Sequence, residues 1–220
     1  MKIIVSSIAF ATLLTTVTIT NAQTYLAVDG GAMFQQDATL RHSAPDSQET
    51  AAFKTGARGD LDLGYNFNPY VAAELEGGFM WNSINKVDGE SLSSLPNNQS
   101  DDIYSIPLLA NLFIKIPTHT PLIPYFGVGA GGNISILNLK ENGVGLDGPF
   151  SINDTKTDIE PAVQGEAGLR YMLCRNASIG IGYKFMATLA QRYNFSDLND
   201  RLTISGIYIH TVFINFKVNF

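Results

Sequence analysis

Four acidic side chains recur at alternate positions of two neighbouring segments, and carboxylates clustered in this way can bind cations. Asp60 and Asp62 belong to the first segment, and Glu74 and Glu76 belong to the second. With a turn centred near residue 68, Asp60 would lie opposite Glu76 and Asp62 opposite Glu74. Like charges this close repel one another and need neighbouring cations. This acidic wall is consistent with a structural ion-pair network, a cation site or a narrow polar path.

Basic side chains that follow the same alternation supply the cations. In a later hairpin, a short turn centred on Arg175 places Glu166 opposite Lys184, and we expect an ion pair between them. Arg170, nearer to that turn, would be able to reach the acidic wall. The favoured interpretation is an ion-pair network on one face of the sheet, formed by Arg58, Asp60, Asp62, Glu74, Glu76, Lys115, Glu166, Arg170 and Lys184.

The histidines are the residues to test for acyl-transfer chemistry, because a lipid deacylase or acyltransferase needs a histidine beside a serine and an acid. His42 precedes Ser43 in a long polar connection, and an acid of that connection would complete the set. His119 falls in a shorter connection, and His210 has no acid near it in the sequence. The pattern predicts no catalytic residue and no enzyme, with a lipid-modifying enzyme kept as an alternative.

Two further features of the sequence could take part in chemistry, but both are better explained by structure. The glycine-rich residues 127–132 lack the lysine and the helix that a phosphate-binding loop requires, so small side chains in a crowded interior explain them better. Cys174 is the only cysteine, which excludes an intrachain disulfide. The long connections are rich in acids but contain no Ca²⁺-loop motif. We therefore predict no cofactor and no metal site.

Alternation of apolar and polar residues with period two defines the elements that must position these groups. Eight strands are predicted, at residues 25–34, 56–67, 70–81, 103–116, 124–136, 160–173, 177–189 and 203–220. Their connections alternate between long (36–53, 83–102, 138–158, 190–202) and short (66–69, 117–123, 174–176). This alternation predicts an all-β fold, an eight-stranded antiparallel up-and-down transmembrane β-barrel with short periplasmic turns and four long extracellular loops.

The distribution of aromatic residues decides which face of each strand points outward. Aromatics of the apolar face gather toward the two strand ends, as the two interfaces of a membrane require. Trp81, Tyr104 and Tyr208 lie toward the long loops, and Phe67, Phe126, Tyr171, Phe216 and Phe220 toward the short turns. Charges of both signs occupy the other face at mid-strand. We therefore place the charged face inside, while ordinary amphipathic strands of a soluble lipocalin-like barrel remain the alternative.

Composition and the N-terminal sequence place the chain in the cell envelope. Of 220 residues, 45% are hydrophobic and only 15% charged, and the net charge of −6 argues against nucleic acid as a partner. Residues 1–22 have a basic start, a short apolar stretch and a small-x-small end at Ala22, which predicts a cleaved secretory signal peptide. The barrel domain is then residues 23–220.

The sequence ends within a strand, on an aromatic residue. Its alternating outward residues are Tyr208, Val212, Ile214, Phe216, Val218 and Phe220. This pattern resembles the C-terminal signal that is read by the barrel-assembly machinery of Gram-negative bacteria. The last strand must also pair with the first, because an unpaired sheet edge is not tolerated in lipid.

Three segments resemble small outer-membrane β-barrel proteins of the opacity-like and OmpA-like type. They are LGYNFNPYVAAELEGG, IPYFGVGAGG and GLRYMLCRNASIGIGYKF. The resemblance implies a non-enzymatic, porin-like outer-membrane protein with a structural or surface-interacting (adhesin- or antigen-like) role. A small porin or conduit for a hydrophobic or small polar solute is the alternative. The implied partners are outer-membrane lipid, lipopolysaccharide, the assembly machinery and an extracellular ligand of the long loops.

The terminal aromatic residue generates the first prediction. Replacing Phe220 with Ala should slow or prevent insertion, because it removes the aromatic group on which the proposed signal ends. Heat-modifiable migration of the folded barrel in cells measures this, with Phe67→Ala as a control that also removes an outward aromatic. Wild-type levels of folded Phe220→Ala protein would contradict the terminal-signal hypothesis.

Overall fold

The computed structural model describes residues 23–41, 48–87, 90–91, 102–145, 148–189, 191–195, 200–204 and 206–220. The predicted signal peptide, residues 1–22, lies outside these ranges. Eight antiparallel strands form the barrel: β1 (Gln23–Gln35), β4 (Gly56–Asn66), β5 (Val71–Val87), β7 (Asp102–Lys115), β8 (Leu122–Gly145), β9 (Gly148–Met172), β10 (Ala177–Thr188) and β13 (Tyr208–Asn219). Among the described residues, no helix is long and apolar enough to cross a membrane.

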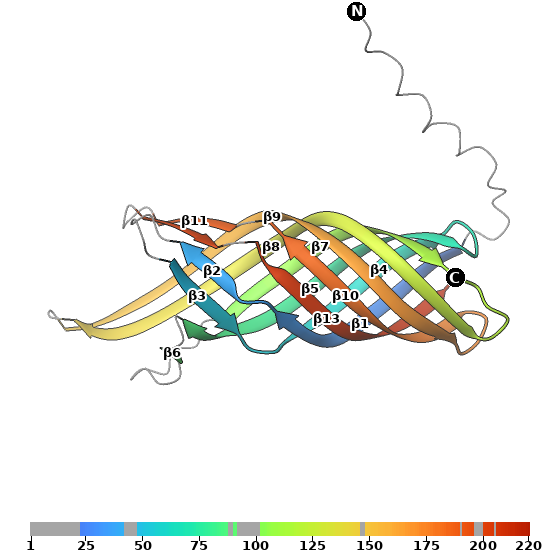
Figure 1. Ribbon diagram of the computed structural model, residues 1–220, viewed down its shortest axis with the longest axis horizontal. Helices are drawn as coiled ribbons and strands as arrows, with labels where there is room; N and C mark the ends of the chain where they lie inside the picture. The colour runs from blue at the N-terminus through green and yellow to red at the C-terminus, as the bar shows by residue number, and fades with distance from the viewer. Residues whose placement is uncertain are drawn as a thin grey trace, which may run out of the picture.

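Neighbouring barrel strands pair in sequence order, and the sheet closes when β13 pairs with β1 (Figure 1). Tyr25 of β1 lies opposite Asn219, and the backbone N–H of Phe220 donates to the carbonyl oxygen of Thr24 at 2.9 Å. The last residue therefore takes part in closing the barrel. Closure satisfies the backbone groups of both edge strands, as a structure within lipid requires.

The connections predicted as long loops contain additional strands. They are β2 (Ala38–Arg41), β3 (Gln48–Phe53), β6 (Glu90–Ser91), β11 (Gln191–Phe195) and β12 (Asp200–Ile204). In addition, β8 and β9 stay paired as far as Gly145 and Gly148, so most of residues 138–158 forms a hairpin rather than a loop. This hairpin projects beyond the barrel at the end opposite the short turns (Figure 1). We call the end of the barrel from which this hairpin projects the extended end, and the opposite end the short-turn end.

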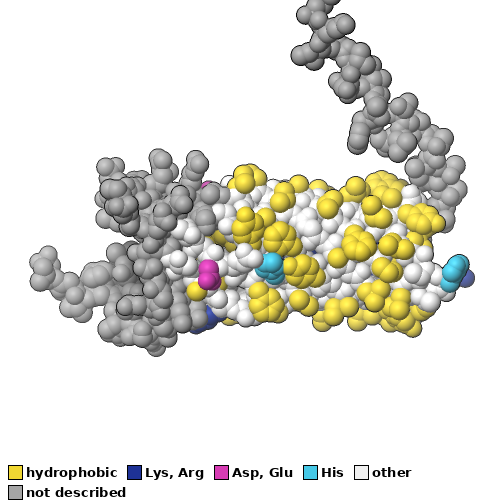
Figure 2. Space-filling model, in the orientation of Figure 1, with side chains coloured by type: hydrophobic (Ala, Val, Ile, Leu, Met, Phe, Trp, Pro, Cys, Tyr) yellow, Lys and Arg dark blue, Asp and Glu magenta, His cyan; other side chains and the backbone are white. Residues whose placement is uncertain are grey.

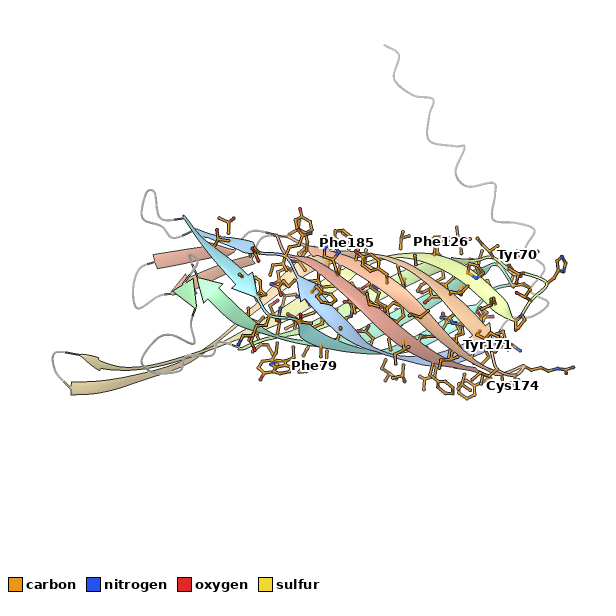
Figure 3. The ribbon with its side chains drawn as sticks, turned by 60° about the horizontal axis from the view of Figure 1, so that its bottom comes forward. Tyr70, Phe79, Phe126, Tyr171, Cys174 and Phe185 are labelled. Atoms are coloured by element: carbon orange, nitrogen blue, oxygen red, sulfur yellow. The ribbon has the colours of Figure 1, made fainter. Side chains whose placement is uncertain are left out.

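The outer wall of the barrel is apolar. The described strands alternate between inward-facing buried residues and outward-facing exposed ones, and hydrophobic side chains cover the outer surface (Figure 2). Phe79 and Phe185 nearer the extended end, and Phe126 and Tyr171 nearer the short turns, project away from the wall (Figure 3). The predicted outward orientation of the apolar face is therefore confirmed, and such a face is what a lipid environment requires.

Inward aromatic rings pack across glycines of the neighbouring strand. Tyr25 lies opposite Gly64, and a Cβ on that glycine would lie 2.0 Å from the Tyr25 ring. Tyr125 opposite Gly168 repeats the arrangement, with a distance of 2.5 Å. Phe113 and Phe213 face glycines in the same way. Each ring thus fills space that a side chain on the opposing strand would need.

The first hairpin has a register different from the predicted one. Asp62 lies opposite Glu76, while Asp60 and Glu74 both face glycines, so the predicted pairs Asp60–Glu76 and Asp62–Glu74 are wrong. The cause is the turn. The Asn68 side chain accepts hydrogen bonds from the backbone N–H groups of Tyr70 and Val71 at 2.8 and 2.7 Å, which centres the turn one residue later.

The apolar outer wall generates a prediction about lipid contact. Leu63 and Ile181 are 59% and 57% exposed on that wall. Arginine at either position should lower the free energy of unfolding in lipid by roughly 2–4 kcal/mol if it lies near the bilayer midplane. Urea titration of the refolded barrel in phosphatidylcholine vesicles measures the loss. His119→Arg, in an exposed turn, is the control, and equal stability of all three variants would contradict the lipid-facing assignment.

Candidate functional site: the barrel interior

The interior is built of layers that can be followed along β1. Met33 belongs to an apolar layer toward the extended end, Asp29 to a charged layer, and Tyr25 to an aromatic layer toward the short turns. Because β1 contributes every second residue to the lumen, each layer lies about two inward positions from the next. The charged layer contains most of the residues expected to do chemistry.

Arg58 links three strands within the charged layer. Its Nε donates to both Asp60 carboxylate oxygens at 2.9 Å, and its Nη2 pairs with Glu76 Oε1. The same Nη2 donates at 2.9 Å to Oε1 of Gln164 on β9, a strand that does not neighbour β4 in the barrel. The guanidinium group therefore bridges β4, β5 and β9 across the lumen.

Lys184 is the second centre, and its side chain is only 1% exposed. Its Nζ lies 2.8 Å from Asp29 Oδ2, 2.8 Å from Asp60 Oδ2 and 3.2 Å from Glu76 Oε2. Several acids thus surround one buried ammonium group, which offsets the cost of removing it from water. Together with Arg58, this lysine joins strands on opposite sides of the barrel.

Amide side chains complete the charged layer. Gln164 and Asn111 donate to Glu76 Oε2 at 2.9 and 3.0 Å, and Asn215 donates to Asp29. On β8 the layer is instead bordered by Gly129, where a Cβ would lie 1.8 Å from Asn111 Oδ1. The glycine-rich stretch therefore makes room for the interior side chains. We call these side chains the central network: Asp29, Arg58, Asp60, Glu76, Asn111, Gln164, Glu166, Lys184 and Asn215.

The structure places the predicted hairpin partners Glu166 and Lys184 directly opposite each other. Their charged atoms are 3.7 Å apart, farther than the contacts of Lys184 with Asp29 and Asp60, and Glu166 Oε2 accepts no hydrogen bond. The pair is therefore one arm of a larger network and not its main contact. Asp29, Asn111, Gln164 and Asn215 were not singled out from the sequence, although their inward parity was visible.

Two predicted cations lie outside the acidic wall. Arg170 donates to Asn215 Oδ1 at 3.3 Å and stacks over the Tyr125 ring instead of reaching the acids. Lys115 donates to Asn66 Oδ1 at 2.7 Å and to the Asn68 carbonyl at 3.2 Å. Both were expected at the acidic wall because the alternation of the strands turns them inward. This alternation tells which face a residue is on, but not its position along the barrel axis. Their positions near the short turns separate them from the acidic wall.

Asp62, Glu74 and Glu76 bring carboxylate oxygens within 4.8 Å of one another and form the best candidate for a cation site among the described residues. Glu76 is already committed to Arg58, Lys184 and two amides. Tyr25 donates to Glu74 Oε2 at 3.0 Å. Few oxygens then remain for Ca²⁺ or Mg²⁺, which take six or more ligands.

The apolar layer was missed in the sequence. Met33, Met80, Met186, Leu109 and Ile209 are all buried and point inward, so the lumen toward the extended end is closed by hydrophobic side chains. The sequence contained the information, because these residues alternate in step with the inward charged residues. It was not recognised because the interior was expected to be polar throughout.

The histidines do not form a catalytic set in the described part of the chain. His210 lies on β13, where its ring contacts Tyr183 and its Nε2 lies 2.9 Å from Gln36. His119 is exposed in a short turn. His42 and Ser43 lie outside the described residues. Neither described histidine has an acid among its hydrogen-bonding partners.

A closed antiparallel barrel with an apolar outer wall and charges inside is a transmembrane β-barrel of the outer-membrane class. The model of the outer membrane protein beta-barrel domain family matches residues 8–218, and the chain belongs to this family. Family membership supports location in the Gram-negative outer membrane. No curated protein sequence matches the chain.

Solved structures show the same fold. OprG from Pseudomonas aeruginosa superposes with a TM-score of 0.59 at 16% identity, covering 89% of this chain and 96% of that one. Neisserial surface protein A (NspA) superposes with a TM-score of 0.52 at 17% identity, covering 91% and 99%. Identities this low show a shared architecture and leave the activity to be argued from the site.

The central network generates a prediction about coupling. Lys184→Met should destabilise the barrel by about 3–5 kcal/mol, because buried acids lose their common counter-ion. In double-mutant cycles measured by urea titration, Lys184 should couple more strongly to Asp60 (Asp60→Asn) than to Glu166 (Glu166→Gln), following the two distances. The pair Lys184 and Asp158 (Asp158→Asn) is the distant control. Coupling near zero for both network pairs would contradict the geometry.

Proposed function

We propose that this protein is a non-enzymatic, integral outer-membrane protein that acts through the surface it presents at the extended end. The observation that carries the proposal is the combination of a filled lumen with a projecting β8–β9 hairpin. A barrel whose interior is occupied offers its outer surfaces for recognition, and loops on a rigid scaffold are where binding residues concentrate.

The filled lumen argues against an open pore. Arg58 and Lys184 tie together acids from several strands, and the apolar layer adds a second barrier toward the extended end. An eight-stranded barrel has an interior just wide enough for side chains to fill. A conduit for a small or hydrophobic solute would require these side chains to separate, so we keep it as the alternative.

The hairpin supplies the recognition surface in this proposal. Strands β8 and β9 remain paired without interruption, from Leu122 opposite Tyr171 to Gly145 opposite Gly148. A continuous ladder gives the projecting segment a defined backbone on which an extracellular ligand or a lipopolysaccharide sugar could dock. The assembly machinery is the proposed partner of the C-terminal strand, whose outward residues are exposed along the barrel wall.

Conductance separates the two candidate functions. The wild-type barrel in a planar bilayer should show no steady channel, because charged and apolar layers fill its lumen. A Lys184→Met variant that still folds should show at most brief openings. A steady wild-type conductance would contradict the surface proposal and favour the conduit.

Shortening the hairpin tests the surface role directly. Residues 139–154 are removed, and Asn138 is joined through Asn-Gly to Thr155, its partner in the register. The barrel should remain heat-modifiable, while attachment of expressing cells to immobilised polysaccharide and to neighbouring cells should fall. A variant with a Gly-Ser segment of equal length is the matched control for bulk. Unchanged attachment with both variants would contradict the proposal.

A further inference from the structure

A cavity of about 310 Å³ opens among the short turns, and none of its lining residues belongs to the central network. Four basic side chains line it: Lys115, Arg170, Arg175 and Lys217. None of its lining residues is acidic, and the rest are amides, a serine, prolines and apolar groups. The cavity is therefore positively charged, in contrast to the acidic wall.

The cations of this cavity differ from Arg58 and Lys184 in their partners. Lys217 places its Nζ 3.1 Å from the centroid of the Tyr25 ring, Arg170 stacks on Tyr125, and Lys115 donates to neutral oxygens. Among the described residues, none of the four has a carboxylate within 4.0 Å. Neutral oxygens and ring faces thus replace the acids that the central network supplies.

The cavity also contains a buried hydroxyl group. Ser178 is 1% exposed, lines the cavity, and its Oγ has no hydrogen-bonding partner. Buried polar groups without a partner are rare, and each one in a native structure calls for an explanation. A hydroxyl donor beside several cations is the combination that oxyanions select, since charge-assisted hydrogen bonds are the strong ones.

Clustered like charges repel one another, and an anion bound between them removes that cost. We propose that the short-turn cavity binds a phosphate group, held by Arg170, Arg175 and Lys217 with Ser178 as a neutral donor. The phosphate belongs either to a small soluble molecule of the periplasm or to a phospholipid head group of the inner leaflet. This site is independent of the surface function proposed above.

Equilibrium dialysis with radiolabelled inorganic phosphate tests the site in the full barrel, folded in a maltoside detergent that carries no phosphate. Arg175→Gln and Lys217→Gln should each weaken binding roughly tenfold or more, since each removes a charge-assisted contact. Lys54→Gln, which removes an exposed lysine outside the cavity, is the matched control and should leave binding unchanged. Heat-modifiable migration verifies that each variant is folded.

Two results would overturn the proposal. One is the absence of saturable binding to the wild type, and the other is an equal loss with Lys54→Gln, which indicates non-specific attraction. Because Arg175 lies in an exposed turn, its variant still decides the matter if Lys217→Gln fails to fold. Phosphate binding in nanodiscs with and without phosphatidylglycerol then distinguishes the sources. If phosphatidylglycerol weakens phosphate binding, the site binds the lipid head group. If it has no effect, the site binds a soluble molecule.

Discussion

The buried ammonium of Lys184 is the constraint on which the interior depends. A cation with 1% side-chain exposure is stable only when nearby acids and hydrogen bonds replace its hydration. Asp29, Asp60, Glu76 and Glu166 come from four different strands to do this. Their convergence holds those strands together across the lumen, in addition to the backbone pairing of neighbouring strands.

The two faces of each barrel strand are in different environments, lipid outside and the narrow lumen inside. On the outer face, lipid excludes charge and favours the apolar side chains seen around the wall. On the inner face, a narrow lumen brings charged groups of different strands close enough to pair across it. Toward the short turns, aromatic rings fill the lumen where glycines of the neighbouring strand leave room for them. Toward the extended end, the methionine-rich apolar layer fills it.

The fold could be predicted because alternation, connection lengths and the closing strand are local properties of the sequence. The hairpin at Arg175 was placed correctly for the same reason, since a short turn sets the register of the strands beside it. The hairpin at Pro69 was displaced by one residue because the Asn68 side chain stabilises a turn centred on residue 69. Arg170 and Lys115 show the larger limit: parity gives the face of a strand, whereas contacts across the lumen depend on barrel tilt and stagger.

The central claim is that the lumen is closed between its two ends. Side-restricted labelling tests it most directly. Met172 lines the short-turn cavity, so a Met172→Cys variant in a Cys174→Ser background carries one thiol at that end. In oriented proteoliposomes, a charged, membrane-impermeant thiol reagent should label this cysteine from the short-turn side alone. Equally rapid labelling from the extended side would contradict a closed interior.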